Sequence, residues 1–107
     1  MARAEIHSGI CGFVTNVEAR QAEDNPRCVH LKIESDCKAV QRLAAQLTEV
    51  DPFTEFSYRG SGPQTFQAAP QCLSHAACPV PAGIIKTVEI AAGLALPADV
   101  TIKLSRE

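Results

Sequence analysis

Residues 28–50, CVHLKIESDCKAVQRLAAQLTEV, contain two hydrophobic periods in succession and therefore decide the fold class. In CVHLKIES the apolar residues alternate with polar ones, which predicts a half-buried strand. Ser35 and Asp36 then supply residue types that cap helix N-termini. After them, apolar residues recur three and four positions apart, which predicts an amphipathic helix over residues 37–50 that ends before Pro52.

Further elements are predicted on both sides of this stretch from the same periodicities and from glycine and proline positions. They are a strand with a bend at its glycines over residues 5–19, a weak strand over 53–58, a short helix or turn over 64–77 that breaks at Pro70, a helix over 79–92 that stops at Gly93, and a last strand over 99–105. The chain is thus expected to be one α+β domain spanning residues 1–107. Its architecture would be a small two-layer sandwich, with three or four mostly antiparallel strands and two main helices on one face.

Composition excludes several classes of partner. The net charge is −2, from 10 basic and 12 acidic residues, and no basic patch stands out, so a nucleic-acid partner is not expected. No apolar run approaches the length of a membrane span. The first residues, MARAEIHSGICG, lack the long apolar segment of a signal peptide, so we expect a cytoplasmic protein.

Cysteine is unusually frequent, at five of 107 residues. Thiols stay reduced in the cytoplasm, and an odd number fits a disulfide framework poorly. Metal binding or thiol chemistry is therefore the expectation to test. The cysteines are Cys11, Cys28, Cys37, Cys72 and Cys78.

Two of these cysteines are predicted to stand at helix N-termini. Cys37 follows the Ser-Asp cap of one predicted helix, and Cys78 comes directly before Pro79 at the start of another. Helix N-termini carry partial positive charge and free N–H groups, which favour a thiolate, the form that attacks electrophiles and binds metals. His75, three residues before Cys78, would share its face if that segment were helical.

The first functional hypothesis is a metal site that the fold assembles from distant positions. No CxxC pair occurs, which excludes zinc ribbons and thioredoxin-type redox pairs. Zn²⁺ or an iron–sulfur cluster would suit the available ligands. These are Cys11, Cys37 and Cys78, with His75 or Cys72 as a fourth.

Two alternatives stay open. In the first, Cys78 accepts and passes on sulfur, with Cys37 as a resolving thiol and His75 as a base or positive charge. In the second, the chain is a structural or regulatory domain whose cysteines are buried. Metal or sulfur transfer would involve a protein partner. No GxSxG, HExxH or P-loop motif occurs, so the sequence assigns no enzymatic activity.

Four segments together resemble a small uncharacterised family of anaerobic bacteria and archaea. They are ICGF (10–13), SDC (35–37), HAACPVP (75–81) and IKTVEIAAGLALP (85–97). The resemblance covers nearly the whole chain and supplies no activity. It implies that the family pattern includes Cys11, Cys37, His75 and Cys78.

A second resemblance is local. Residues 78–104, CPVPAGIIKTVEIAAGLALPADVTIKL, are similar to the Cys-Pro-x-Pro helix and following strand of TusA-type sulfur carriers. In that family the cysteine before Pro-x-Pro carries a persulfide, a role that would fall on Cys78. The motif stands near the C-terminus here, whereas in the family it follows the first strand.

Overall fold

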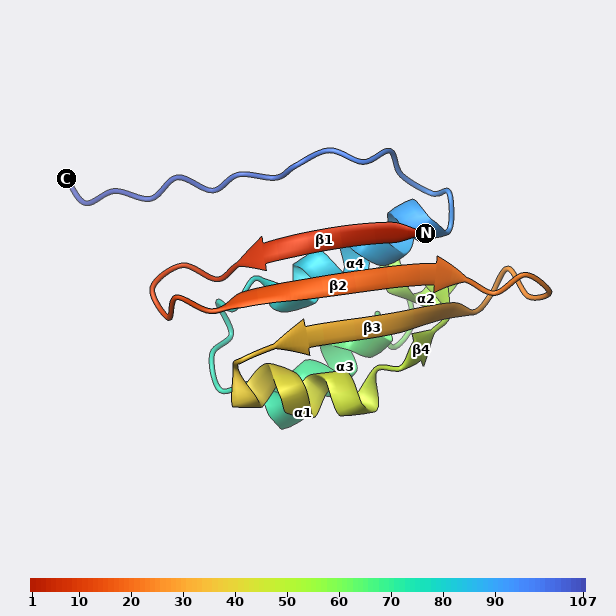
Figure 1. Cartoon of the computed structure of the whole chain (residues 1–107), viewed down its shortest axis with the longest axis horizontal. Coiled ribbons are helices and arrows are strands. Elements are labelled where there is room, and N and C mark those ends of the chain that lie inside the picture. The colour runs from red at the N-terminus through yellow and green to blue at the C-terminus, as the bar shows by residue number, and fades with distance from the viewer.

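The strands form one antiparallel sheet, as predicted. A computed structural model describes all residues, 1–107. The strands are β1 (Ala2–His7), β2 (Val14–Gln21), β3 (Val29–Ser35) and β4 (Glu49–Val50). They lie in the order β1-β2-β3-β4, with each neighbouring pair antiparallel (Figure 1).

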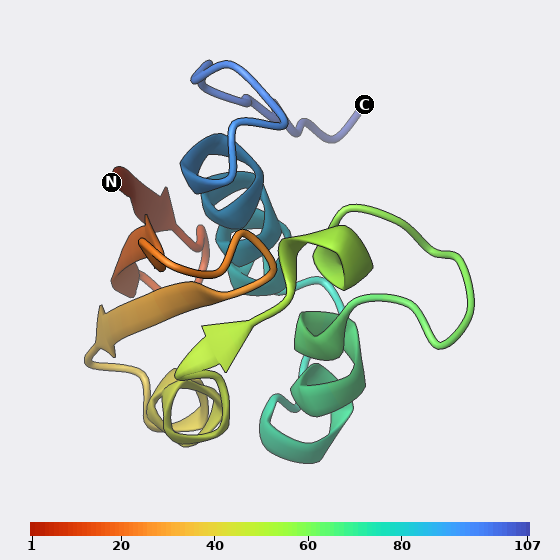
Figure 2. The ribbon, with the colours of Figure 1, turned by 90° about the vertical axis from the view of Figure 1, so that its right-hand side faces the viewer.

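The helices cover one face of this sheet (Figure 2). They are α1 (Lys38–Gln46), α2 (Pro52–Glu55), α3 (Gln64–Cys72) and α4 (Val80–Ala91). α4 packs on β1 and β2, and α1 packs on β3, so these are the two main helices that the sequence predicts. α3 packs against α1 and α4. None of the helices combines the length and the apolar character needed to cross a bilayer.

The predicted strand over residues 5–19 is wrong, because the segment forms two strands. Gly9 and Gly12 adopt positive φ angles of 88° and 76°, which reverse the chain where a bend was expected. The Gly12 N–H donates to the Gly9 carbonyl at 2.9 Å, and the Ser8 N–H donates to the Phe13 carbonyl at 3.1 Å. These bonds close a hairpin between β1 and β2.

The predicted helix over residues 37–50 is too long. α1 ends at Gln46, and Glu49 and Val50 leave it to pair with β3 as β4. The weak strand predicted over 53–58 is also wrong. The Asp51 carboxylate accepts from the Phe53 N–H at 2.9 Å and caps the short helix α2 instead.

Two further predictions fail near the C-terminus. α3 continues through Pro70, where we expected a break, because the proline lies in the last turn and removes only one backbone hydrogen bond. The last strand over 99–105 does not form, since these residues have no strand beside them and make no hydrogen bond. α4 forms as predicted, with Pro79 as N-cap and the positive φ of Gly93, 75°, after its end.

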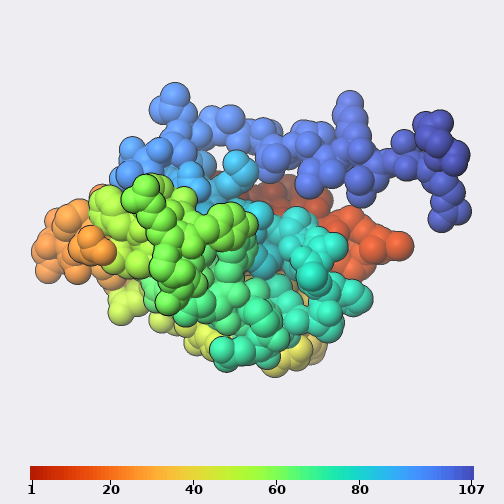
Figure 3. All heavy atoms as spheres, turned by 180° about the vertical axis from the view of Figure 1, so that it is seen from behind, coloured from red at the N-terminus to blue at the C-terminus, as the bar shows by residue number.

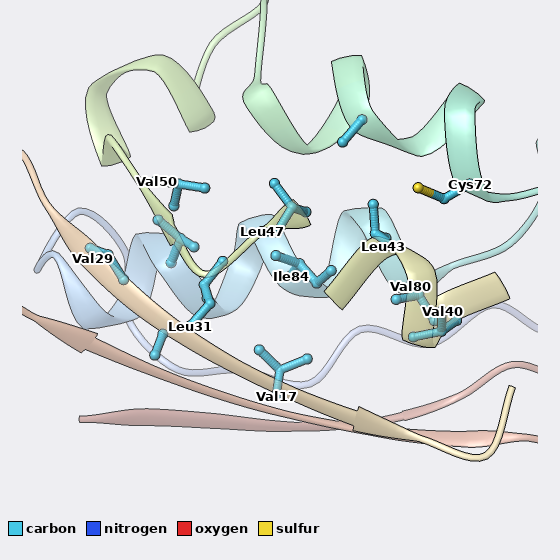
Figure 4. Packing of buried hydrophobic residues seen from close by; sticks show 13 residues of the cluster. Val17, Val29, Leu31, Val40, Leu43, Leu47, Val50, Cys72, Val80 and Ile84 are labelled. Atoms are coloured by element: carbon cyan, nitrogen blue, oxygen red, sulfur yellow. The ribbon is translucent and has the colours of Figure 1, made fainter. Parts of the chain in front are cut away.

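The hydrophobic core lies between the sheet and the helices (Figure 4). Alternate residues of β2 and β3 point inward, whereas their neighbours face solvent. α1 and α4 each supply an apolar stripe that meets these residues. The best-buried aliphatic residues of the core are Val17, Ala19, Val29, Val40, Leu43, Val80, Ile84 and Val88.

One glycine lets a β1 side chain approach the backbone of α4. A Cβ at Gly83 would lie 2.4 Å from Ile6 Cδ1 and 2.8 Å from Ile6 Cγ1. The absence of a side chain at Gly83 therefore lets the Ile6 side chain lie directly on the helix backbone. A glycine inside a helix costs about 1 kcal/mol of stability relative to alanine. The close packing of Ile6 on α4 offsets this cost.

A buried carboxylate connects α2 to α3. Glu55 is 1% exposed, and its carboxylate accepts hydrogen bonds from the Gln64 N–H, the Thr65 N–H and the Thr65 hydroxyl. It thus satisfies free N–H groups at the start of α3. Burial raises the pKa of Glu55 above its ordinary value of 4.5, against the opposite effect of the hydrogen bonds from Thr65 and Gln64.

We expect Gly83→Ala to destabilise the protein by about 1 kcal/mol or more, because the clash with Ile6 exceeds the gain in helix propensity. In an Ile6→Ala background the clashing atoms are gone, and Gly83→Ala should become neutral or stabilising. Urea unfolding of the four proteins in this double-mutant cycle measures the coupling. Equal effects of Gly83→Ala in both backgrounds would contradict the close approach.

We expect Glu55→Ala to destabilise the protein by about 1–3 kcal/mol at pH 7, because two N–H groups of α3 lose their acceptor. Glu23→Ala, on an exposed loop, is the matched control and should change little. The raised pKa means that folding takes up a proton, so the contribution of Glu55 is largest below pH 4.5 and falls as the pH rises through its folded-state pKa. As the pH rises above 4.5, the free energy of unfolding should therefore fall more steeply in the wild type than in Glu55→Ala. Denaturation at several pH values measures this difference.

Candidate functional site

The residues proposed from the sequence gather at one end of the sheet. β1 ends where His7 pairs with Val14, and β3 ends beside the same end of β2, where Ser35 pairs with Thr15. The β1–β2 turn, the start of α1 and the loop before α4 all lie at this end, on the left of Figure 1. We call it the loop end, defined by Cys11, Cys37, His75 and Cys78.

The four side chains of the loop end differ in exposure. Cys11 and His75 are exposed, whereas Cys37 and Cys78 are half-buried and pack against the core. Cys37 is the N-cap of α1, and Cys78 directly precedes Pro79, the N-cap of α4. The exposure of Cys11 does not fit a domain whose cysteines are all buried.

The structure brings these residues to one end but not to a common centre. No three of their potential ligand atoms lie within 4.8 Å of one another. The segment from His75 to Cys78 is a turn rather than a helix, with the Cys78 N–H donating to the His75 carbonyl at 3.3 Å. Cys72, the alternative fourth ligand, is 5% exposed and belongs to the core.

A different group does converge, at the opposite end of the sheet. Potential ligand atoms of Cys28, His30 and Glu49 all lie within 4.8 Å of one another. We call this group the strand-edge triad. Cys28 directly precedes β3, and His30 lies two residues later on the same, solvent-facing side of the strand. Glu49 is the β4 residue directly opposite His30 in the register of the two strands.

The separations within the strand-edge triad suit a tetrahedral ion. Cys28 Sγ lies 3.5 Å from Glu49 Oε2 and 3.9 Å from His30 Nε2, and His30 Nδ1 lies 3.6 Å from Glu49 Oε2. Zinc–ligand bonds of 2.0–2.3 Å at tetrahedral angles place neighbouring ligand atoms roughly 3.4–3.6 Å apart. The two distances to His30 involve different ring nitrogens, and one ion would bind only one of them. With a single nitrogen chosen, the three ligand atoms still lie within 4.8 Å of one another, so the side chains would have to close in on the ion.

The electrostatic setting of the strand-edge triad is negative. Partial burial and the neighbouring Glu49 carboxylate raise the pKa of the Cys28 thiol above its ordinary value, and Asp24 and Asp51 act in the same direction. Arg27 is paired with Asp51 at 2.7 Å, and Arg20 lies opposite His30 in the register of β2 and β3. A bound cation would relieve the crowding of negative charge. The triad is open to solvent, with the His30 side chain 57% and the Glu49 side chain 61% exposed.

Sequence reasoning missed the strand-edge triad for identifiable reasons. The sequence pattern singles out neither residue, because a cysteine at a strand start and an exposed histidine within a strand need no functional explanation. Their i, i+2 spacing on one strand was the available signal, because it puts both side chains on one face. Glu49 was assigned to the helix over 37–50, so its pairing opposite His30 was not foreseeable.

A comparison with protein-family models matches residues 2–104 to a family described as a family of unknown function, DUF6951. This confirms the expected resemblance to an uncharacterised family over nearly the whole chain. No curated protein and no solved structure matches the chain.

Proposed function

Because the chain belongs to DUF6951, a family of unknown function, we propose its function from its side-chain geometry: it binds a zinc-like transition-metal ion at the strand-edge triad. The observation that carries the proposal is the convergence of an imidazole and a carboxylate on two paired strands with a thiol that directly precedes one of them. Because β3 and β4 pair at His30 and Glu49, two of the ligands are already held side by side, and no loop has to become ordered when the ion binds.

The chemistry of the ligands selects the class of metal. Sulfur and nitrogen ligands favour Zn²⁺ and its neighbours, whereas Ca²⁺ and Mg²⁺ prefer oxygen ligands only. Three protein ligands leave one tetrahedral position for water or an incoming ligand. Binding would convert the Cys28 thiol to a thiolate and release a proton.

The exposure of the strand-edge triad supports reversible loading. An ion held here would lie at the surface, where the ligands of a second protein could approach its open position. We infer a role in holding or delivering a metal ion to a protein partner. A buried four-ligand structural site, by contrast, would be closed to exchange.

A second candidate is the loop end, because the three segments that carry its residues lie together there: the β1–β2 turn, the start of α1 and the loop before α4 (Figure 1). Cys37 and Cys78 adjoin the N-termini of the two helices that cover the sheet, where a thiolate is stabilised. Closing a zinc or iron–sulfur site would require the turn carrying Cys11 to move inward. Sulfur transfer would need Cys78 alone, although its half-burial favours this less than a fully exposed thiol would.

We expect one Zn²⁺ or Co²⁺ per chain, with a thiolate charge-transfer band for Co²⁺. Cys28→Ser and Glu49→Gln should weaken binding, Cys28→Ser on the order of 10- to 100-fold, because each removes a ligand. Competition titration with a chromophoric chelator measures the affinity. Glu34→Gln, on the same face of β3 but at its other end, is the control and should bind as the wild type does. Unchanged affinity in Cys28→Ser would refute the strand-edge triad.

The loop end predicts a different result in protein purified without oxygen. Finding iron with sulfide and a broad visible band would assign the metal site to the loop end. So would a zinc ion that is lost in Cys37→Ser and Cys78→Ser but kept in Cys28→Ser. Loss of that metal in Cys11→Ser would separate a metal site from a sulfur carrier, which needs only Cys78. A carrier instead predicts a persulfide on Cys78 by mass spectrometry, and rapid alkylation of that thiol. An unreactive Cys78 in the folded protein would exclude sulfur transfer.

A further inference from the structure

The residues after α4 are apolar yet exposed. The last hydrogen bond of the chain joins the Leu94 N–H to the Glu89 carbonyl, and no later residue makes a hydrogen bond or an ion pair. Leu96, Ile102 and Leu104 are 90%, 74% and 89% exposed. Figure 3 shows this segment running along the outside of the molecule and beyond its end. Exposed aliphatic side chains in this number indicate a surface that another element covers.

The pattern within residues 99–105, DVTIKLS, is that of a half-buried strand. Val100, Ile102 and Leu104 fall on one side, and polar residues fall on the other. A strand of this kind is stable only beside a sheet edge whose inner side is apolar. In the single chain the segment is extended and has no strand beside it.

The sheet has one free edge of matching length. β1 is the outermost strand, with six residues, and its outer backbone groups have no partner strand. Its inward side chains Ala4 and Ile6 pack against the core but stay partly exposed, so the inner side of this edge is incompletely covered. The opposite edge strand, β4, has only two residues.

We propose that residues 99–105 of one chain add to the free edge of β1 in a second copy, and reciprocally, to form a two-fold strand-exchanged dimer. The segment leaves α4 and runs in the same direction as its own β1 without pairing with it (Figure 1). Each copy therefore carries one segment with the pattern of a strand and one unpaired sheet edge. A two-fold axis pairs the segment of each copy with the edge of the other through the same contact. Every exposed edge of this kind is otherwise a template for uncontrolled pairing.

Side-chain complementarity supports an antiparallel register. With Lys103 opposite Glu5, opposite charges meet on the solvent side of the sheet. The same register places Ile102 opposite Ile6 and Leu104 opposite Ala4, so the apolar side of the segment extends the layer that covers α4. The charged pair and the apolar pairs therefore both fit the same register between residues 99–105 and β1.

The test is the mass of the full chain in solution by light scattering and sedimentation, over micromolar concentrations. We expect a dimer, with twice the 11.4 kDa of one chain. Ile102→Asp should weaken dimerisation at least tenfold, whereas Thr101→Asp, which places the same charge on the opposite side of the strand, should leave it nearly unchanged. Glu5→Lys should weaken the dimer, and combining it with Lys103→Glu should restore it.

Removal of residues 98–107 should give a folded monomer, because they make no hydrogen bond with the body. Circular dichroism and the unfolding transition check that the body stays intact. A full chain that remains monomeric overturns the proposal, whether or not hydrogen exchange finds residues 99–105 protected by the chain's own β1. A dimer that survives both the truncation and Ile102→Asp also overturns it, because its interface would lie elsewhere.

Discussion

The packing of α4 across β1 and β2 is the contact on which the rest of the structure depends. Val80, Ile84 and Val88 are fully buried along one side of the helix, and Gly83 brings its backbone against Ile6. A helix held this closely along its length fixes what lies at both of its ends. At its start stand Pro79 and the half-buried Cys78, and from its end the apolar C-terminal segment leaves the body.

The two candidate sites differ in what holds them. The strand-edge triad rests on backbone pairing, because His30 and Glu49 face each other across paired strands. Its ligand separations follow from sheet geometry and need only side-chain rotation to suit an ion. The loop end rests on three loops, one of which turns at two glycines, so bringing Cys11 to Cys37 and Cys78 requires loop movement. Pre-organisation therefore favours the triad, whereas the number of cysteines favours the loop end.

The C-terminal segment illustrates how a local pattern depends on a partner. Its alternation is as regular as that of β3, and yet β3 is a strand and residues 99–105 are not. The difference is that β3 has β2 on one side and β4 on the other, whereas the segment has no neighbour within one chain. The weak alternation in residues 53–58 predicted a strand, but part of this stretch is helical. The Asp51 side chain caps the helix and outweighs the strand pattern.

The sequence by itself determined the fold class, the course of β3, and the positions of α1 and α4, because strict periodicity and proline or glycine punctuation act locally. It also determined that Cys37 and Cys78 adjoin helix N-termini. Only the tertiary structure decided that residues 5–19 make a hairpin, that Glu49 leaves α1 to pair with His30, and that the four residues of the loop end do not share a centre. Each of these depends on which segments meet in space, and the spacing of residues within one segment does not say which other segment it will meet.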